Sequence, residues 1–394
     1  MNIKKRFVVI LLIVLLAIFP VAVNASGAQS QNFVDERYEL VSLVFRLAES
    51  RILIDFPDRA ADFAPMMAFY NDDTEYMRLL NTTFGGFVNH PVVEYVIYLW
   101  SSGYYPMSND VFAMAIHLER DGEEFALVDN IALMIMPEIF DFNTWTESNA
   151  HEFVNLLNDF YRDTNFGQFF EEHTEFFQEI SAPFAENVVN NFNFEWFEQF
   201  GANLNNINIF ISPSKTNLAF GLTRYCTNTG EWIVYSAQPV GTNFSRAQIN
   251  HYQRVLAHEI AHSFSNPMAE IWYAENENFR GWVHSTLQNN EQQMLQQGYG
   301  IAMIVAYEYV TRAYEILYMM ENTNANLWRT LAESRFGSGF TYIENVFAMV
   351  TDHTPMLHII IPLVIIGAVL IIVVLPATLV ILWRKRRKLK KAEH

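Results

Sequence analysis

The chain has 394 residues, enough for one large domain or two lobes, and hydrophobic residues make up 51% of it. Its formal net charge of −18 argues against a nucleic-acid partner, because so acidic a surface repels phosphates. The single cysteine, Cys226, excludes an internal disulfide, so stability must come from the core. Cys226 lies in a predicted strand with no motif around it, so we interpret it as structural rather than as a catalytic thiol.

The first 25 residues have the layout of a secretory signal peptide. Lys4, Lys5 and Arg6 form a positive region, and a long apolar run follows them. Small residues then surround Ala25, after which cleavage is predicted. Because the apolar run is long for a signal peptide, an uncleaved membrane anchor is the alternative.

Residues 33–200 predict a mainly helical lobe, because their apolar side chains recur at helical spacing. The clearest stretches are residues 36–49, 90–100, 109–118 and 146–161. The second of these opens with Pro91, which suits a first helical turn. Residues 160–184 carry many aromatic side chains at the same spacing, so we interpret these rings as core rather than as a ligand cage.

Three short segments after Gly201 alternate between apolar and polar residues and are rich in β-branched and aromatic residues. They are residues 206–212, 218–226 and 231–237. Turn-forming residues separate them, so we expect antiparallel strands in a small meander. The predicted fold class is therefore α+β and mostly α, with a small antiparallel sheet placed before the helix of the candidate active site.

A helix is predicted over residues 245–264, and it begins with a serine, a good N-cap residue. Pro267 is expected to stop it. A long helical pattern follows over residues 288–321, with a predicted break at Gly298 or Gly300.

Residues 359–383 form an uncharged apolar stretch, and about 20 such residues span a bilayer as a helix. The tail, residues 384–394, is dense in Lys and Arg, which the positive-inside rule places in the cytoplasm. We therefore predict a single-pass protein of the cell membrane, with residues 351–358 next to the membrane and residues 26–350 outside the cell. The outer domain comprises the helical lobe and a zincin-like part from residue 201 onward. We interpret its acidity mainly as an aid to solubility.

The motif His258-Glu259-Ile260-Ala261-His262 lies on the predicted helix. Histidines four residues apart emerge one turn apart on the same face, so both rings can bind one Zn²⁺ at about 2.1 Å. Glu259 sits on the flank, where it can take a proton from a zinc-bound water as general base. The alternative is a half-buried helix with two histidines at its solvent edge.

A catalytic zinc usually has three protein ligands and one open position. The residues after His262 do not continue as a metzincin motif, so the third ligand must come from further along. The candidates are Glu270, Glu275, Glu277, His284 and Glu308. We favour Glu308, because it lies in an apolar helix, where burying a charged side chain is costly unless it is paired or binds a metal. Arg312, one turn later, would orient it, whereas the alternative is an ordinary surface pair.

The oxyanion of a hydrolytic transition state needs a hydrogen-bond donor beside the metal. Tyr299, Tyr307 and Arg312 are candidates for this or for an orienting role, and the sequence does not rank them. His284 is a further candidate donor, although a lone histidine is more often structural.

Several segments together resemble a bacterial domain-of-unknown-function family of zincin-like (gluzincin-like) metallopeptidases. That family carries the motif His-Glu-x-x-His-Ser-Phe-x-Asn-Pro, which here spans residues 258–267. Its upstream helices resemble residues 36–48, 90–99, 112–118 and 160–166. Downstream, Glu308-x-x-x-Arg312-Ala313 is similar to a later helix of that family. The resemblance covers about residues 33–350 and implies a zinc peptidase without naming a substrate, and the C-terminal membrane helix is an addition in this chain.

Two functions fit these observations. The first is a membrane-anchored extracellular metallopeptidase that uses Zn²⁺ to hydrolyse a peptide or protein substrate, and it predicts that His258, His262 and a downstream Glu converge in a cleft. The alternative is a non-catalytic binding or sensing domain on the same scaffold, with a blocked cleft or a missing ligand. Glu259 favours the enzyme, because a mere metal binder does not need that carboxylate. A transporter is disfavoured, because one spanning helix does not line a path by itself.

Overall fold

The computed structural model describes residues 33–57, 74–102, 108–122, 124–128, 145–202, 207–214, 220–226, 230–237, 244–323 and 325–353. The predicted signal peptide and the predicted membrane helix with its basic tail lie outside these ranges. Among the helices of the described ranges, none has the length and apolar character needed to cross a bilayer.

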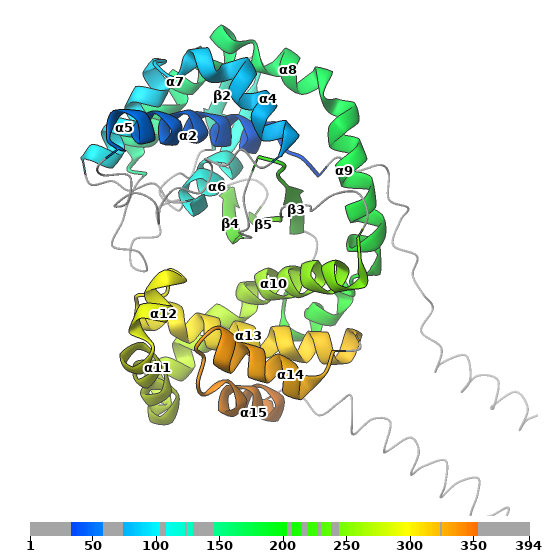
Figure 1. The fold of residues 1–394 in the computed structure, drawn as a ribbon. Coiled ribbons are helices and arrows are strands. Elements are labelled where there is room, and N and C mark those ends of the chain that lie inside the picture. Colours follow the sequence, from blue (N-terminus) through cyan, green and yellow to red (C-terminus); the bar gives the residue numbers. More distant parts are fainter. Residues whose placement is uncertain are drawn as a thin grey trace, which may run out of the picture.

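Two helical lobes enclose a small sheet (Figure 1). The upper lobe contains α2 (Glu36–Asp55), α4 (Glu75–Phe84), η2 (Gly85–Phe87), α5 (Pro91–Ser101), α6 (Ser108–Ile116), α7 (Glu147–Thr164) and α8 (Phe166–Glu172). Down one side runs α9 (Thr174–Asn187), followed by the short turns η4 (Val189–Asn191) and η5 (Phe194–Phe200). The lower lobe contains α10 (Arg246–Glu275), α11 (Glu277–Asn289), α12 (Glu291–Gln296), α13 (Ala302–Asn322), α14 (Leu327–Ala332), the π-helical turn η7 (Glu333–Gly337) and α15 (Ile343–His353). The mostly helical α+β prediction is therefore confirmed.

Local signals place the upper-lobe helices where the sequence predicts them. At the start of α2, the Asp35 side chain accepts a hydrogen bond from the Arg37 backbone at 2.9 Å, which satisfies one of the unpaired N–H groups of the first turn. Pro91 occupies the first turn of α5, behind a His90 cap. The aromatic segment is core as predicted, since Phe160, Phe166 and Phe177 are buried, and Phe170 and Phe176 are partly buried and packed against the core.

A hairpin of β1 (Leu118–Asp121) and β2 (Glu124–Leu127) was not predicted. The Asn158 side chain on α7 bonds both the backbone N–H and the carbonyl of Phe125, at 2.8 and 2.9 Å. This hairpin therefore depends on a helix that comes later in the chain, which local alternation does not reveal.

The central sheet has the order β3 (Ile207–Ile211), β5 (Gly230–Ala237), β4 (Phe220–Cys226). β4 and β5 are antiparallel, as predicted, but β3 pairs with β5 in parallel, so the simple meander is wrong. Alternation identifies strands but not their partners. Another contact holds β3 from outside the sheet, because the Ile211 N–H donates to the Phe33 carbonyl at 3.0 Å. The Phe33 N–H in turn donates to the Ser181 hydroxyl at 3.3 Å.

Helix α10 begins at the predicted cap, where Ser245 and Gln248 form a capping box. It then continues through Pro267 to Glu275, so the predicted stop is wrong. A proline inside a helix costs about 3 kcal/mol, because it removes one hydrogen bond and its ring crowds the preceding turn. Burial on both sides offsets this cost, with Ala261 before the proline and Ala269 after it fully buried.

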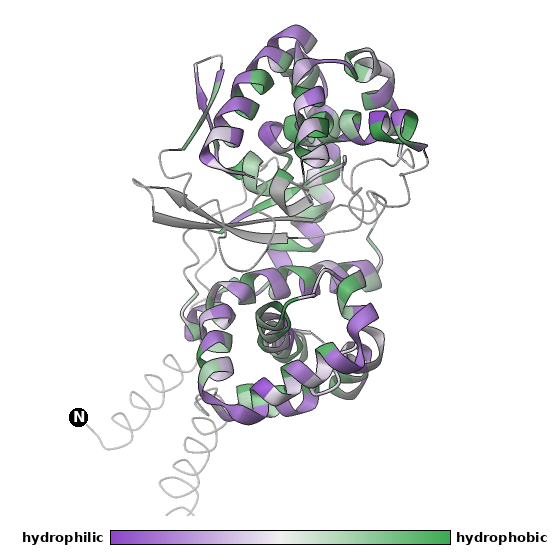
Figure 2. Cartoon of the chain, turned by 90° about the vertical axis from the view of Figure 1, so that its left-hand side faces the viewer, coloured by the Kyte–Doolittle hydropathy of each residue, from purple (hydrophilic) through white to green (hydrophobic). Residues whose placement is uncertain are grey.

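Helix α13 forms the centre of the lower lobe. Every residue from Ile304 to Met319 is buried, and Figure 2 shows the helices of this lobe as a ring around an apolar one. The predicted break before it is confirmed, since α12 ends at Gln296 and Gly298 has a φ of +82°.

Candidate metal centre

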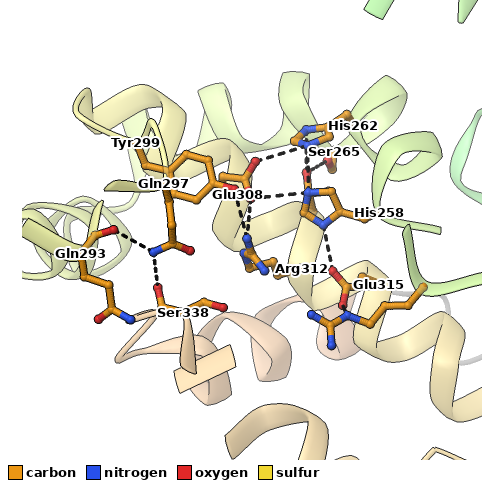
Figure 3. Close-up of polar contacts among 12 residues, drawn as sticks. His258, His262, Ser265, Gln293, Gln297, Tyr299, Glu308, Arg312, Glu315 and Ser338 are labelled. Atoms are coloured by element: carbon orange, nitrogen blue, oxygen red, sulfur yellow. Dashed lines mark hydrogen bonds and ion pairs between the residues drawn. The ribbon is translucent and has the colours of Figure 1, made fainter. Parts of the chain in front are cut away.

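Helices α10 and α13 bring the three favoured ligands together (Figure 3). The Nε2 atoms of His258 and His262 are 3.2 Å apart. Glu308 faces both rings, with Oε2 3.5 Å from the His258 Nε2 and Oε1 3.5 Å from the His262 Nε2. These three side chains form a group that could hold a metal ion, with all ligand atoms within 4.8 Å of one another.

The separations suit a tetrahedral ion. Ligand atoms about 2.1 Å from such an ion lie about 3.4 Å from each other. The observed 3.2, 3.5 and 3.5 Å are close to this edge length. Glu308 Oε2 is buried, and no described residue donates a hydrogen bond to it. Arg312 Nη2 lies 3.1 Å from this oxygen but only as an ion pair, so the oxygen keeps a lone pair for a cation.

The outer nitrogens of both rings are also held. His258 Nδ1 lies 2.8 Å from Glu315 Oε2, and His262 Nδ1 lies 2.9 Å from Asn266 Oδ1. When each Nδ1 donates to one of these oxygens, Nε2 is the nitrogen that faces the site, where a metal cation would bind it in place of a proton. The Thr311 hydroxyl is a further neighbour of His262, at 3.1 Å from Nδ1.

Two carboxylates create a strongly negative environment for His258. Burial lowers the pKa of His258, but the negative charges of Glu308 and Glu315 and the hydrogen bond with Glu315 outweigh burial and raise it to about 10. Burial raises the pKa of Glu308, yet the charges of His258 and Arg312 outweigh that effect and hold it well below its usual value. The space between the carboxylates therefore favours a positive charge.

Glu315 is itself buried, with 2% of its side chain exposed, and Arg254 Nε lies 2.6 Å from its Oε1. Burial raises the pKa of Glu315, and the hydrogen bond from His258 and the charge of Arg254 together lower it below its usual value. Arg254 also approaches Glu333 of η7, at 3.7 Å. This chain of charges links His258 to the surface of the lower lobe.

Arg312 is buried, so the alternative of an ordinary surface pair with Glu308 is wrong. Its guanidinium lies over the ring of Phe340 at 4.6 Å and near that of Tyr299 at 5.9 Å. It donates to the Tyr299 hydroxyl at 3.2 Å. Burial and the charge of Glu308 raise the pKa of Tyr299, although the charge and the hydrogen bond of Arg312 act to lower it.

The other predicted candidates lie elsewhere. Glu270 accepts a hydrogen bond from the Tyr307 hydroxyl at 2.7 Å, and the His284 ring bonds Tyr273 at 3.0 Å. The remaining two, Glu275 and Glu277, end α10 and begin α11. Within the described ranges, none of these four candidates belongs to the metal-capable group.

Sequence reasoning missed the residues that orient the ligands. Glu315 follows Glu308 by seven positions on one helix, which puts both on the same face. Asn266 follows His262 by four positions, with the same result. Helical periodicity could have found Asn266, once α10 was recognised to continue beyond Phe264, but for Glu315 it shows only the shared face with Glu308 and not the contact with His258.

Comparison with known proteins gives a family but no activity. No curated protein and no solved structure matches this chain. A family model described as a domain of unknown function (DUF4932) matches residues 32–353. The match includes both helices of the candidate metal centre and all of the described residues. The chain therefore belongs to the DUF4932 family.

Proposed function

We propose that this protein is a zinc-dependent metallopeptidase of the gluzincin type. The convergence of His258, His262 and Glu308 on one point carries this proposal. Glu259 lies beside the first of these ligands on the same helix and supplies the carboxylate that hydrolysis requires. A metal site without catalysis would need the three ligands alone.

The donor set favours zinc over other common ions. Two imidazoles and one carboxylate leave a fourth tetrahedral position open, which is the ligand count of catalytic zinc sites. Magnesium and calcium prefer sets made only of oxygen atoms. Bound here, Zn²⁺ would lower the pKa of a coordinated water to about 7 and polarise the substrate carbonyl.

Each residue then has a defined task in peptide hydrolysis. The water oxygen bonds to the carbonyl carbon, and Glu259 accepts the proton that the water loses. The carbonyl π electrons move to its oxygen and return when the C–N bond breaks. Glu259 passes its proton to the leaving nitrogen, so the products are a carboxylic acid and an amine. Glu315 and Asn266 keep the two rings in place throughout.

We further propose that this activity operates at the cell surface on a peptide or protein substrate. The predicted signal peptide and the predicted membrane helix of residues 359–383 support this location. The basic tail after that helix supports the orientation with the catalytic part outside.

The test uses the full chain in detergent micelles, supplied with zinc. Elemental analysis is expected to find about one zinc per chain, and cleavage of fluorescein-labelled casein is expected to follow. Glu259→Gln, purified identically, should bind zinc equally and cleave at least about a hundredfold more slowly. Folded wild type that binds no zinc would overturn the proposal. Zinc binding without Glu259-dependent cleavage would instead favour the non-catalytic binding or sensing domain.

A further inference from the structure

The hydroxyl of Tyr299 has an unusual position beside the metal centre. It accepts a hydrogen bond from Arg312 Nη2 at 3.2 Å, and Arg312 in turn pairs with the ligand Glu308 at 3.1 Å. A phenolic oxygen that accepts in this way still has its own proton to donate. No described residue accepts that proton.

The two other candidate donors are already engaged. The Tyr307 hydroxyl donates to Glu270 at 2.7 Å, so its proton is committed. Arg312 is divided between Glu308 and Tyr299, and it is packed against Phe340 at 4.6 Å. Its movement toward a substrate would leave Glu308 without the cation that neutralises it. Only Tyr299 among the three combines proximity to the centre with an uncommitted proton.

The backbone around Tyr299 holds its ring in place. Tyr299 lies between Gly298 and Gly300 in the connection from α12 to α13, and its N–H donates to the Met294 carbonyl at 2.8 Å. Gly298 has a φ of +82°, which other residues rarely adopt. A Cβ at Gly300 would lie 3.1 Å from the Leu295 side chain.

A second set of contacts fixes this connection to the loop after η7. The Gln297 amide donates to the carbonyls of Gln293 and Ser338, at 2.9 and 3.1 Å (Figure 3). The Gln293 amide donates to the Gly337 carbonyl at 2.8 Å. A donor held by such contacts needs no reorganisation when charge develops nearby, which is the condition for effective electrostatic stabilisation.

We propose that Tyr299 is the hydrogen-bond donor to the oxyanion that forms on the substrate carbonyl during hydrolysis. This inference rests on the proposed peptidase function and adds a catalytic residue to it. The proton stays on the phenol and is shared with the oxyanion, and it is withdrawn when the carbonyl re-forms. Arg312 positions the hydroxyl, and its charge strengthens the donation.

The test measures the affinity of the metal centre for a ligand that binds through oxygen, and this affinity does not depend on turnover. The full chain is loaded with Co²⁺, whose visible spectrum reports its ligands, and is titrated with acetohydroxamate. Tyr299→Phe should weaken hydroxamate binding at least about tenfold, because one hydrogen bond to a charged group is lost. Tyr307→Phe is the matched control, and its affinity should stay within about twofold. Spectra before titration should be the same in all three proteins.

Activity gives the second readout. With labelled casein, Tyr299→Phe should lower kcat about 10²- to 10³-fold and leave KM unchanged, because the donor acts in the transition state. Unchanged hydroxamate affinity in Tyr299→Phe, or an equal loss in Tyr307→Phe, would overturn the assignment. If Glu259→Gln cleaves casein as fast as wild type while Tyr299→Phe still loses hydroxamate affinity, the peptidase proposal fails, and Tyr299 remains a donor to an oxygen ligand of the metal but not to a hydrolytic oxyanion. Absence of cobalt binding would overturn both.

Discussion

Helices α2 and α13 each bury a row of polar side chains in their own lobe, yet they differ in what those side chains meet. The row on α2 is Glu39, Ser42, Arg46 and Glu49, and the row on α13 is Glu308, Thr311, Arg312 and Glu315. Both carboxylate oxygens of Glu39 accept hydrogen bonds from hydroxyl groups, one from Ser212 at 2.5 Å and one from Tyr76 at 3.1 Å. Glu308 instead meets two imidazoles and keeps one oxygen without a hydrogen-bond donor among the described residues. A buried carboxylate alone thus does not mark a site, whereas convergence with free lone pairs does.

The sharpest test of this contrast is metal affinity. Glu308→Gln should weaken zinc binding by about three orders of magnitude or more, because it removes an anionic ligand and leaves two imidazoles. Glu39→Gln, the matched change on α2, should leave zinc affinity unchanged. Competition with a chromophoric chelator measures both. Equal affinities in Glu308→Gln and wild type would remove Glu308 from the ligand set.

The second prediction concerns stability, and here the large effect is expected from the buried carboxylate of α2 rather than from that of α13. Burial raises the pKa of Glu39 to about 7, although the hydroxyls of Ser212, Ser214 and Tyr76 act to lower it. The folded state therefore binds the proton more tightly than the unfolded state, whose carboxyl titrates near 4.5. The stabilisation that the protonated Glu39 gives the folded state is fully present below about pH 4.5 and is lost as the pH rises through about 7.

Glu39→Gln should consequently raise the free energy of unfolding by up to about 3 kcal/mol at pH 8 and change it little at pH 4. Urea denaturation at the two pH values measures this difference. Glu124→Gln, on the exposed face of the β1–β2 hairpin, is the control and should show no such pH dependence. A destabilised Glu39→Gln at pH 8 would mean that the charged form is the one that the lobe stabilises.

The smallest expected effect concerns the carboxylate behind His258. Glu315→Gln keeps an acceptor for the His258 N–H but removes its charge, so zinc affinity should fall about 10- to 100-fold. Glu333→Gln is the control, because Glu333 also lies near Arg254 but does not contact the site. Isothermal titration of zinc into both variants measures the ratio. If the two variants bind zinc equally, Glu315 does not tune the ligand.

The sequence was sufficient for features that depend on local pattern. The HExxH helix, the serine cap, the break near Gly298 and the grouping of Glu308 with the two histidines all follow from spacing or from a charge among apolar neighbours. The wrong predictions all involve contacts between distant segments. The parallel pairing of β3 with β5 is one case, and the continuation of α10 through Pro267 is another, since burial against the rest of the lobe overrides the local penalty.

The same distinction explains what was missed at the site. Glu315 could be recognised as an orienting residue only after α10 and α13 were known to lie side by side, because its partner His258 is 57 positions away. The three candidate donors were equivalent in sequence, and they became distinguishable through their hydrogen-bond partners. Ranking such candidates requires knowledge of which protons are already committed.

The anchoring of Phe33 sets a limit on how the chain can be trimmed. Its N–H and carbonyl are bonded to Ser181 and Ile211, and its side chain is buried against Phe184. A protease needs several residues of extended, accessible backbone, so digestion from the N-terminal side should halt just before this point. The predicted cut after Ala25 would leave the contacts of Phe33 intact. A maturation cut beyond Phe33 would instead release the first helix from the sheet and expose the core of the upper lobe.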